Sequence, residues 1–305
     1  MRALRGRRLK PHHHRESKVK MILITGATGA VGRPLVEFLA GQGAEVRAVT
    51  RAPESADLPA GVEVVEGDPS RPDTVAPHLD GVAAVFLHSR TFGETADRLL
   101  SLARERGATR VVALSAMNVD DPLELQPSRY RGDRNKESEE AAVASGLEWT
   151  SLRVSSFAGN TLQAWGAQIR AGDVVRYVYA AFEESLIDER DLVEVAARAL
   201  LTDELAGRRL ELTGPQSLSH EQMVAVIARV IGRPLRYHEV PPEAAQQAMI
   251  GNGLPEPFVE ALMARYAAYV QWQQHPVTDE VEKILGRPAR TYAEWVADHV
   301  AGFQN

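Results

Sequence analysis

Hydrophobic and polar residues alternate in two different patterns along the first half of the chain. Short apolar runs rich in β-branched residues are each followed by a stretch in which apolar residues recur every three or four positions. The first pattern predicts buried strands and the second predicts amphipathic helices. Their alternation therefore predicts a parallel sheet with helices on both faces. The strands are expected at residues 21–25, 45–50, 63–66, 83–87, 110–115 and 149–153. The helices are expected at residues 33–41, 72–79, 96–106 and 136–145.

The pattern of apolar residues changes after residue 153, where helical periodicity predominates. Helices are expected at residues 160–170, 191–201 and 219–231, strands at 173–179, 208–213 and 235–239, and mostly helix beyond. Ser219 is a suitable N-cap for the third of these helices, and Gly232 is a suitable residue to end it. This half therefore predicts a smaller lobe of mixed α+β structure.

The first expected strand and helix are joined by a glycine-rich turn, in the sequence MILITGATGAVG at residues 21–32. Gly26 permits a tight turn, Gly29 lets the backbone approach a phosphate, and Gly32 lets the helix pack close to the strand. The helix then points its N-terminal N–H groups at the anion. This combination predicts a Rossmann-type doubly wound α/β sheet that binds a dinucleotide, and the alternative is an ordinary structural turn. We expect the Rossmann core at residues 20–158 and the C-terminal substrate lobe at residues 159–305.

Charge is distributed unevenly along the chain. The first 20 residues hold eight basic residues and one acidic residue, which leaves 27 basic and 40 acidic residues in the remainder. The chain after residue 20 is acidic enough to repel nucleic acid, and we therefore expect no nucleic-acid partner. Residues 1–19 lack an apolar segment, so we expect a disordered basic tail, with Met21 close to the natural start. The adjacent histidines of the tail, His12, His13 and His14, are a poor preformed site, and we predict no metal.

The composition also limits where the protein acts. No apolar run approaches the ~20 residues that a membrane helix needs, so we expect no membrane partner. The sequence has no cysteine, which excludes disulfides and cysteine nucleophiles and fits a reducing compartment. We expect a cytoplasmic protein that acts on a small-molecule substrate, and a homodimer is an open alternative.

The residues that follow the expected strands indicate which nucleotide would bind. An NAD-preferring Rossmann site usually has Asp or Glu after the second strand, whereas this chain has Arg51, which suits a 2′-phosphate. The sequence therefore favours NADP(H) over NAD(H), and the alternative is a solvated loop arginine. Asp68, after the third strand, is placed to meet the adenine amine or to form an Asx turn. Leu87 and His88, at the end of the fourth strand, face the cofactor in this topology, although His88 is equally well explained as a loop histidine.

Several motifs in the expected order give the chain a family resemblance. TGATGAVG, the GD pair after the third strand, ALSAMN after the fifth and KESEEAAVASGLEWTSLRVSSFAGN are similar to the short-chain dehydrogenase/reductase superfamily. SLIDERDLVEVAARALL and ILGRPARTYAEWVADHVAGF extend the likeness over residues 21–303. The chain most resembles the atypical NmrA-like branch of NAD(P)-binding oxidoreductases and redox sensors.

This resemblance implies roles for individual residues. Arg51 would contact the 2′-phosphate and Asp68 the adenine, while Ser115 and Lys136 would lie near the nicotinamide ribose. The pyrophosphate loop would consist of Gly26, Thr28, Gly29, Ala30, Val31 and Gly32. The segment that lines the nicotinamide would include Val154, Ser155 and Phe157.

One departure from the superfamily pattern concerns the proton donor. The usual catalytic pair is Tyr-x-x-x-Lys, in which the lysine lowers the pKa of the tyrosine. Gly132 stands four residues before Lys136, and Tyr130 lies six residues before it in a polar loop at 118–135 that we expect at the active site. The candidate catalytic residues are Lys136, Ser115, Tyr130 and His88. Either Lys136, His88, Tyr130 or water supplies the proton, or no proton-coupled ketone chemistry occurs. The alternative for Lys136 itself is a plain surface lysine on its helix.

These features predict an NADP(H)-dependent oxidoreductase that transfers hydride to a small quinone-like, enone or carbonyl acceptor. A conjugated acceptor is favoured because conjugation stabilises its reduced anion, which lessens the need for a strong general acid. Two alternatives stay open. One is a non-catalytic NADP(H)-sensing regulatory protein, and the other is a cofactor-retaining epimerase or tailoring enzyme of secondary metabolism.

Overall fold

Seven strands form one parallel sheet in a computed structural model that describes residues 21–272 and 276–304. The strand order is β3-β2-β1-β4-β5-β6-β9, and every neighbouring pair runs parallel. The strands are β1 (Ile22–Ile24), β2 (Val46–Thr50), β3 (Glu63–Glu66), β4 (Ala84–Leu87), β5 (Arg110–Ala116), β6 (Glu148–Val154) and β9 (Arg208–Leu212). The order reverses between β1 and β4, which is where open α/β sheets bind ligands. The predicted fold class is confirmed, whereas the predicted tail at residues 1–19 lies outside the described residues.

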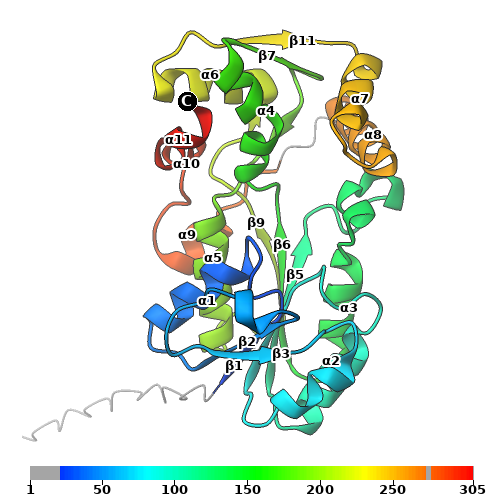
Figure 1. Cartoon of the computed structure of the whole chain (residues 1–305), viewed down its shortest axis with the longest axis vertical. Coiled ribbons are helices and arrows are strands. Elements are labelled where there is room, and N and C mark those ends of the chain that lie inside the picture. The colour runs from blue at the N-terminus through cyan, green and yellow to red at the C-terminus, as the bar shows by residue number, and fades with distance from the viewer. Residues whose placement is uncertain (1–20, 273–275, 305) are drawn as a thin grey trace, which may run out of the picture.

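Helices cover both faces of this sheet (Figure 1). One layer consists of α1 (Gly32–Gly41) and α5 (Glu189–Leu201), which pack against each other, and the other of α2 (Ala96–Glu105) and α3 (Asn135–Ala144). Ile22 and Ile24 point into the first layer, and Leu23 between them points into the second. Because both faces of β1 are buried, its sequence is a continuous apolar run rather than an alternating one.

The other elements form a smaller lobe, at the top of Figure 1. Its helices are α4 (Gly159–Ala171), α6 (His220–Ile231), α7 (Pro242–Gly251), α8 (Glu256–Trp272), α10 (Tyr292–Asp298) and α11 (Val300–Phe303), while α9 (Glu280–Leu285) packs on α5. β7 (Val174–Tyr177) pairs with β11 (Arg236–Glu239), and β8 (Glu183–Glu184) pairs with β10 (Leu218–Ser219). The lobe has its own core, in which Trp165, Phe182 and Tyr266 are buried.

The chain returns to the sheet after residue 158. Both β9 and α5 come from the segment expected to form the lobe, yet β9 pairs with β6 and α5 packs on α1. The sheet and one of its helical layers are therefore built from both sides of the expected boundary. Within residues 21–272 and 276–304, no helix combines the length and the apolar character that crossing a bilayer requires.

Two predicted elements differ in the structure, and one predicted cap is confirmed. Residues 72–79 form two short 3₁₀ turns, η2 (Pro72–Thr74) and η3 (Ala76–His78), instead of one helix. Pro77 has no N–H to donate and its ring crowds the preceding turn, so an α-helix cannot run through it. β7 ends at Tyr177 because Tyr179 has a φ of +51°, outside the strand region. Ser219 caps α6 in a capping box, as predicted, and Gly232 ends it in the left-handed conformation.

Candidate nucleotide and substrate site

The turn after β1 forms a cradle in which side chains are excluded at two positions. Gly26 has a φ of +67°, and a Cβ on it would lie 3.1 Å from three carbon atoms of the His88 side chain. A Cβ on Gly32 would lie 2.1 Å from the carbonyl oxygen of Gly26. Helix α1 begins at Gly32, and its first turn, which lies within the described residues, has neither a side-chain cap nor an acidic residue. The positive end of its dipole is therefore free of such a partner, which suits an anion.

The residues of this turn do not all present side chains to the outside. Thr28, Gly29 and Ala30 are exposed. Val31 is buried in the core shared with α5. Any contact of Val31 with a nucleotide would therefore use its backbone, while Thr28 and Ala30 would also offer side chains.

A threonine that the sequence analysis did not single out ties β1 to β4. The Thr25 hydroxyl is fully buried, donates to the carbonyl oxygen of Phe86 at 3.0 Å and accepts from the His88 N–H at 2.9 Å. It therefore fixes the glycine turn relative to the residues that follow β4. A threonine after an apolar run looks like any strand residue, so the sequence carries no signal for this role. Leu87, the last residue of β4, is completely buried against the α2 layer and leaves only its backbone at this edge.

His88 stands beside the glycine turn as a neutral imidazole. The Arg90 N–H donates to its Nδ1 at 3.2 Å, which assigns the ring hydrogen to Nε2. Burial lowers the pKa of His88 to about 4, although the Asp133 carboxylate opposes this effect. At neutral pH the ring can donate a hydrogen bond from Nε2 but carries no imidazolium proton. The structure therefore supports His88 as a hydrogen-bonding residue rather than as the proton donor.

Arg51 follows β2 at the adenosine end of the predicted site. It is exposed and lines a hollow of about 370 Å³ together with Gly67, Asp68 and Arg71. Among residues 21–272 and 276–304, Arg51 has no hydrogen-bond or ion-pair partner. Its guanidinium is therefore available to an anion, as a 2′-phosphate contact requires.

Asp68 adopts the local turn that was the alternative to an adenine contact. Its carboxylate accepts from the Ser70 hydroxyl at 2.7 Å and N–H at 3.0 Å, and from Arg71 Nε at 3.3 Å. The Ser70 hydroxyl is the main cause of a lowered pKa of Asp68. The carboxylate is thus largely used within the turn, and the adenine contact stays a prediction.

Arg33, in the first turn of α1, is a second arginine at this end and was not predicted. Its guanidinium donates to the carbonyl oxygen of Ala56 at 2.8 Å and also to that of Asp57. These bonds fasten the loop after β2, which carries Arg51, to the helix whose N-terminus is predicted to face the pyrophosphate. An arginine after a glycine-rich turn has no distinctive spacing, so the sequence did not reveal this connection.

The candidate catalytic residues come together only in part. The buried Ser115 hydroxyl at the end of β5 donates to the carbonyl oxygen of Asn135, the first residue of α3, at 3.2 Å. Lys136 follows at once, is exposed and has no bonding partner among the residues that the structure describes. Tyr130 lies in η5 (Pro127–Arg131), is 47% exposed, and has no hydrogen bond to Ser115 or Lys136 in that same part of the chain. Ser115 therefore lies beside the backbone that carries Lys136, without a tyrosine between them.

The segment predicted to line the nicotinamide is fixed by its neighbours. Val154 ends β6 and is buried. The Ser155 N–H donates to the backbone of β9 at 3.0 Å, and its hydroxyl donates to the carbonyl oxygen of Ser185 at 2.7 Å. Phe157 forms a β-bridge with Ile187. These contacts hold the segment where the lobe meets the carboxyl end of the sheet.

A polar cluster that the sequence did not reveal lies at the same junction. The Ser156 hydroxyl donates to Glu184 Oε1 at 2.6 Å, and Arg265 Nη2 donates to the same oxygen at 2.7 Å. Ser156 follows β6, Glu184 belongs to β8, and Arg265 belongs to α8. Because these segments are distant in the sequence and share no motif, only the fold shows that they meet.

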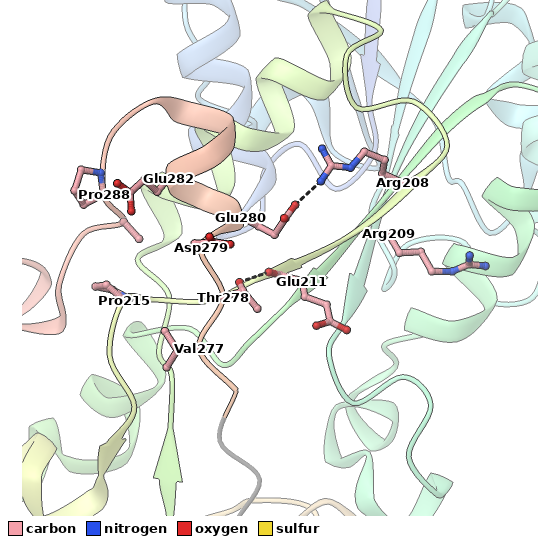
Figure 2. A pocket seen from close by; sticks show the side chains of 11 residues that line it. Arg208, Arg209, Glu211, Pro215, Val277, Thr278, Asp279, Glu280, Glu282 and Pro288 are labelled. Atoms are coloured by element: carbon pink, nitrogen blue, oxygen red, sulfur yellow. Dashed lines mark hydrogen bonds and ion pairs between the residues drawn. The ribbon is translucent and has the colours of Figure 1, made fainter.

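A second hollow, of about 790 Å³, lies along the edge strand β9 (Figure 2). Both arginines that line it are paired: Arg208 binds Glu280 at 2.6 Å, and Arg209 binds Glu139 at 2.6 Å. None of the predicted nucleotide or catalytic residues lines it. We therefore place the candidate site at the reversal point between β1 and β4 and not in this hollow.

Comparisons with known proteins agree with this geometry. Residues 26–200 match a family described as NAD(P)H-binding. The chain is 36% identical over 285 residues to (4-alkanoyl-5-oxo-2,5-dihydrofuran-3-yl)methyl phosphate reductase of Streptomyces griseus subsp. griseus, a match that covers 93% of this chain and 99% of the relative. It is 31% identical over 288 residues to an NAD(P)H azoreductase of Xenophilus azovorans, again over 93% and 99% of the two chains.

A solved structure shares the architecture as well. The NADPH-dependent quinone oxidoreductase of Escherichia coli, in complex with NADPH, superposes with a TM-score of 0.78 over 92% of this chain and 100% of that one, at 22% identity. At this identity the likeness shows the fold alone. All three proteins are named as reductases or oxidoreductases, in agreement with the predicted class of reaction. The match to residues 26–200 and the 36% identity over nearly the whole chain confirm the predicted resemblance: the chain belongs to the NAD(P)H-binding family.

Proposed function

We propose that this protein is an NADPH-dependent reductase that transfers hydride to a small conjugated acceptor such as an enone or a quinone. The observation that carries the proposal is the cradle at Gly26 and Gly32, which has no room for side chains and faces the N-terminus of α1. A pyrophosphate fits such a cradle because backbone N–H groups and the helix dipole bind it. When bound, the reduced nicotinamide supplies the hydride, and the chain orients the acceptor beside it.

The arrangement of the catalytic candidates supports a conjugated acceptor. Tyr130 is exposed and does not join Ser115 and Lys136, while His88 is neutral near pH 7 because burial lowers its pKa to about 4. A plain ketone would need a proton donor at its oxygen, whereas conjugation spreads the charge of a reduced enone or quinone. The names of the relatives point the same way, since one describes a 5-oxo-2,5-dihydrofuran with a 4-alkanoyl group, in which two carbonyls flank a ring carbon.

The preference for NADP(H) rests on Arg51. Its guanidinium in the hollow after β2 has no partner among the described residues, which supports binding of a 2′-phosphate, and no carboxylate stands at that position to bind a ribose hydroxyl. We expect NADPH to bind at least roughly tenfold more tightly than NADH, the difference that about 1.4 kcal/mol represents. Calorimetric titration with NADPH, NADP⁺, NADH and NAD⁺ measures this preference.

The Arg51→Ala variant provides the specific test of that contact. It should lose the preference for the phosphorylated nucleotides and leave NADH affinity unchanged. Arg229→Ala, which removes an exposed arginine from α6 in the lobe, is the matched control and should bind as the wild type does. Equal affinity of the wild type for NADPH and NADH would refute the assignment of Arg51.

The activity itself is tested by following NADPH absorbance with 2-cyclohexenone and 1,4-naphthoquinone as acceptors. We expect consumption of NADPH that depends on both enzyme and acceptor. Tight NADPH binding without consumption across such acceptors would contradict the reductase and favour the alternative of a nucleotide-sensing protein.

A further inference from the structure

Arg265 on α8 lies at the junction between the lobe and the segment after β6. Its Nη2 donates to Glu184 Oε1 at 2.7 Å, the oxygen that also accepts the Ser156 hydroxyl at 2.6 Å. Ser156 stands between Ser155 and Phe157, two residues that we expect beside the nicotinamide. Glu184 Oε1 therefore connects the Arg265 guanidinium to the segment that we expect beside the nicotinamide.

Two aromatic rings lie near the guanidinium of Arg265, and the helix that carries it packs against the loop after β5. Its Cζ lies 4.9 Å from the ring centre of Tyr269 and 5.7 Å from that of Phe182. One turn along α8, the Tyr269 hydroxyl donates to Asp121 Oδ2 in the loop after β5 at 2.7 Å. Helix α8 also packs on η4 (Leu123–Leu125) and η5 in that loop (Figure 1). Both loops at the carboxyl ends of β5 and β6 are thus connected to the helix that carries Arg265.

The hydrogen-bonding capacity of Arg265 is not filled by the protein. Its Nε is buried and has no acceptor among the described residues. By contrast, Arg90 uses both Nε and Nη2 on the two oxygens of Asp133, at 3.0 and 2.7 Å. Arg47 and Arg110 also have an unfilled Nε, but their Nη1 atoms donate to backbone carbonyl oxygens. Within residues 21–272 and 276–304, Arg265 has Glu184 as its one carboxylate partner, while its side chain is only 15% exposed.

We propose that Arg265 is the substrate-side contact for the carbonyl oxygen of the conjugated acceptor and stabilises the negative charge that develops there. The inference rests on the proposed function. A fixed cation in a partly water-excluded site binds a developing oxyanion more strongly than it binds a neutral carbonyl. Glu184 is a positioning residue, because it holds the guanidinium toward the segment after β6.

The chemistry balances with a single water as the proton source. Hydride adds to the β-carbon of the enone, the C=C electron pair shifts toward the carbonyl, and the oxygen becomes an enolate oxygen that Arg265 holds. A proton from water then adds to the α-carbon, and the hydroxide that remains leaves to the solvent, so the acceptor gains two electrons that the nucleotide supplies. Arg265 keeps its own protons throughout, as a guanidinium does. It therefore compensates for the missing tyrosine by binding charge and not by donating a proton.

The test compares Arg265→Gln with the wild type on two acceptors. We expect kcat/KM to fall roughly 100-fold on 2-cyclohexenone, the usual cost of removing one oxyanion donor. The fall should be smaller on 1,4-naphthoquinone, whose reduced oxygens are less basic. The dissociation constant for NADPH should not change, and Arg229→Gln should behave as the wild type.

Arg265→Lys provides a second variant that keeps the positive charge beside Glu184. It should be more active than Arg265→Gln but at least roughly tenfold less active than the wild type, since an ammonium lacks the planar fork of a guanidinium. Wild-type activity of either variant on both acceptors would overturn the assignment of Arg265. If the wild type itself binds NADPH but reduces neither acceptor, the proposed function fails and this assignment fails with it.

Discussion

The two sides of the candidate site are built in different ways. On the nucleotide side, a glycine turn and a helix N-terminus present backbone groups, and the absence of side chains at Gly26 and Gly32 lets His88 and α1 pack close to the turn. On the substrate side, Ser156, Glu184 and Arg265 come from three distant segments and meet through their side chains. One side is thus specified by local backbone geometry and the other by tertiary packing.

This difference explains which changes each side tolerates. A Cβ on Gly32 would meet the backbone of the turn, and a Cβ on Gly26 would meet the His88 side chain. The side chains of the substrate side lie in segments outside the seven-stranded sheet. Folds often carry variable loops on a fixed scaffold, so we expect substitutions in the lobe to change the acceptor without changing nucleotide binding.

The change that breaks the nucleotide side most directly is Gly32→Ala. Its Cβ would lie 2.1 Å from the carbonyl oxygen of Gly26, so α1 must move away from the turn. We expect a loss of roughly 3 kcal/mol in the free energy of unfolding. We also expect NADPH affinity to fall roughly 100-fold, which corresponds to about 2.7 kcal/mol. Chemical denaturation and calorimetric titration measure the two effects.

Gly41→Ala, at the other end of the same helix, is the matched control. A Cβ there would meet nothing within 4 Å. The variant should gain up to about 1 kcal/mol from helix propensity and bind NADPH as before. Equal behaviour of the two variants would contradict the cradle.

His88 adds a titratable side chain to the nucleotide side, which otherwise presents backbone groups. Its pKa is lowered to about 4 in the folded protein by burial, against an ordinary value of 6.5. Between these values the unfolded chain binds more protons than the folded one, so stability falls as pH drops from 6.5 to 4. We expect a loss of roughly 2–3 kcal/mol over this window from His88 alone.

This pH dependence is measured by urea denaturation of the wild type and of His88→Asn. The variant should show a shallower loss of stability over the same range. An NMR titration that gives His88 a pKa near 6.5 would contradict the neutral imidazole, and with it the exclusion of His88 as the proton donor.

The smallest expected effect concerns a local feature of the lobe. Ser219 caps α6, and its hydroxyl accepts from the Gln222 N–H at 3.1 Å. Ser219→Ala should lower the free energy of unfolding by about 1 kcal/mol, while Ser219→Asp should restore most of it. NADPH affinity should stay the same in both variants, because the cap is remote from the glycine turn. A change in affinity would show that the two sides are coupled more closely than the packing indicates.

Features that depend on local sequence could be predicted, whereas features that depend on tertiary packing could not. The glycine turn, the strands of the sheet and the cap at Ser219 were predictable because each depends on residues next to one another. The helix expected at residues 72–79 failed because Pro77 overrides a periodic pattern. The return of β9 to the sheet and the meeting of Arg265 with Glu184 could not be predicted, since periodicity contains no information on which distant segments pair.

Isotope transfer from NADPH deuterated at both C4 positions shows directly whether this protein passes hydride to a conjugated acceptor. The purified protein would be incubated with this nucleotide and 2-cyclohexenone in ordinary water, and the product analysed by mass spectrometry. We expect cyclohexanone with one deuterium at the β-carbon and an ordinary hydrogen, derived from water, at the α-carbon. Product without deuterium, or nucleotide binding with no product, would contradict hydride transfer from NADPH to a conjugated acceptor in this site.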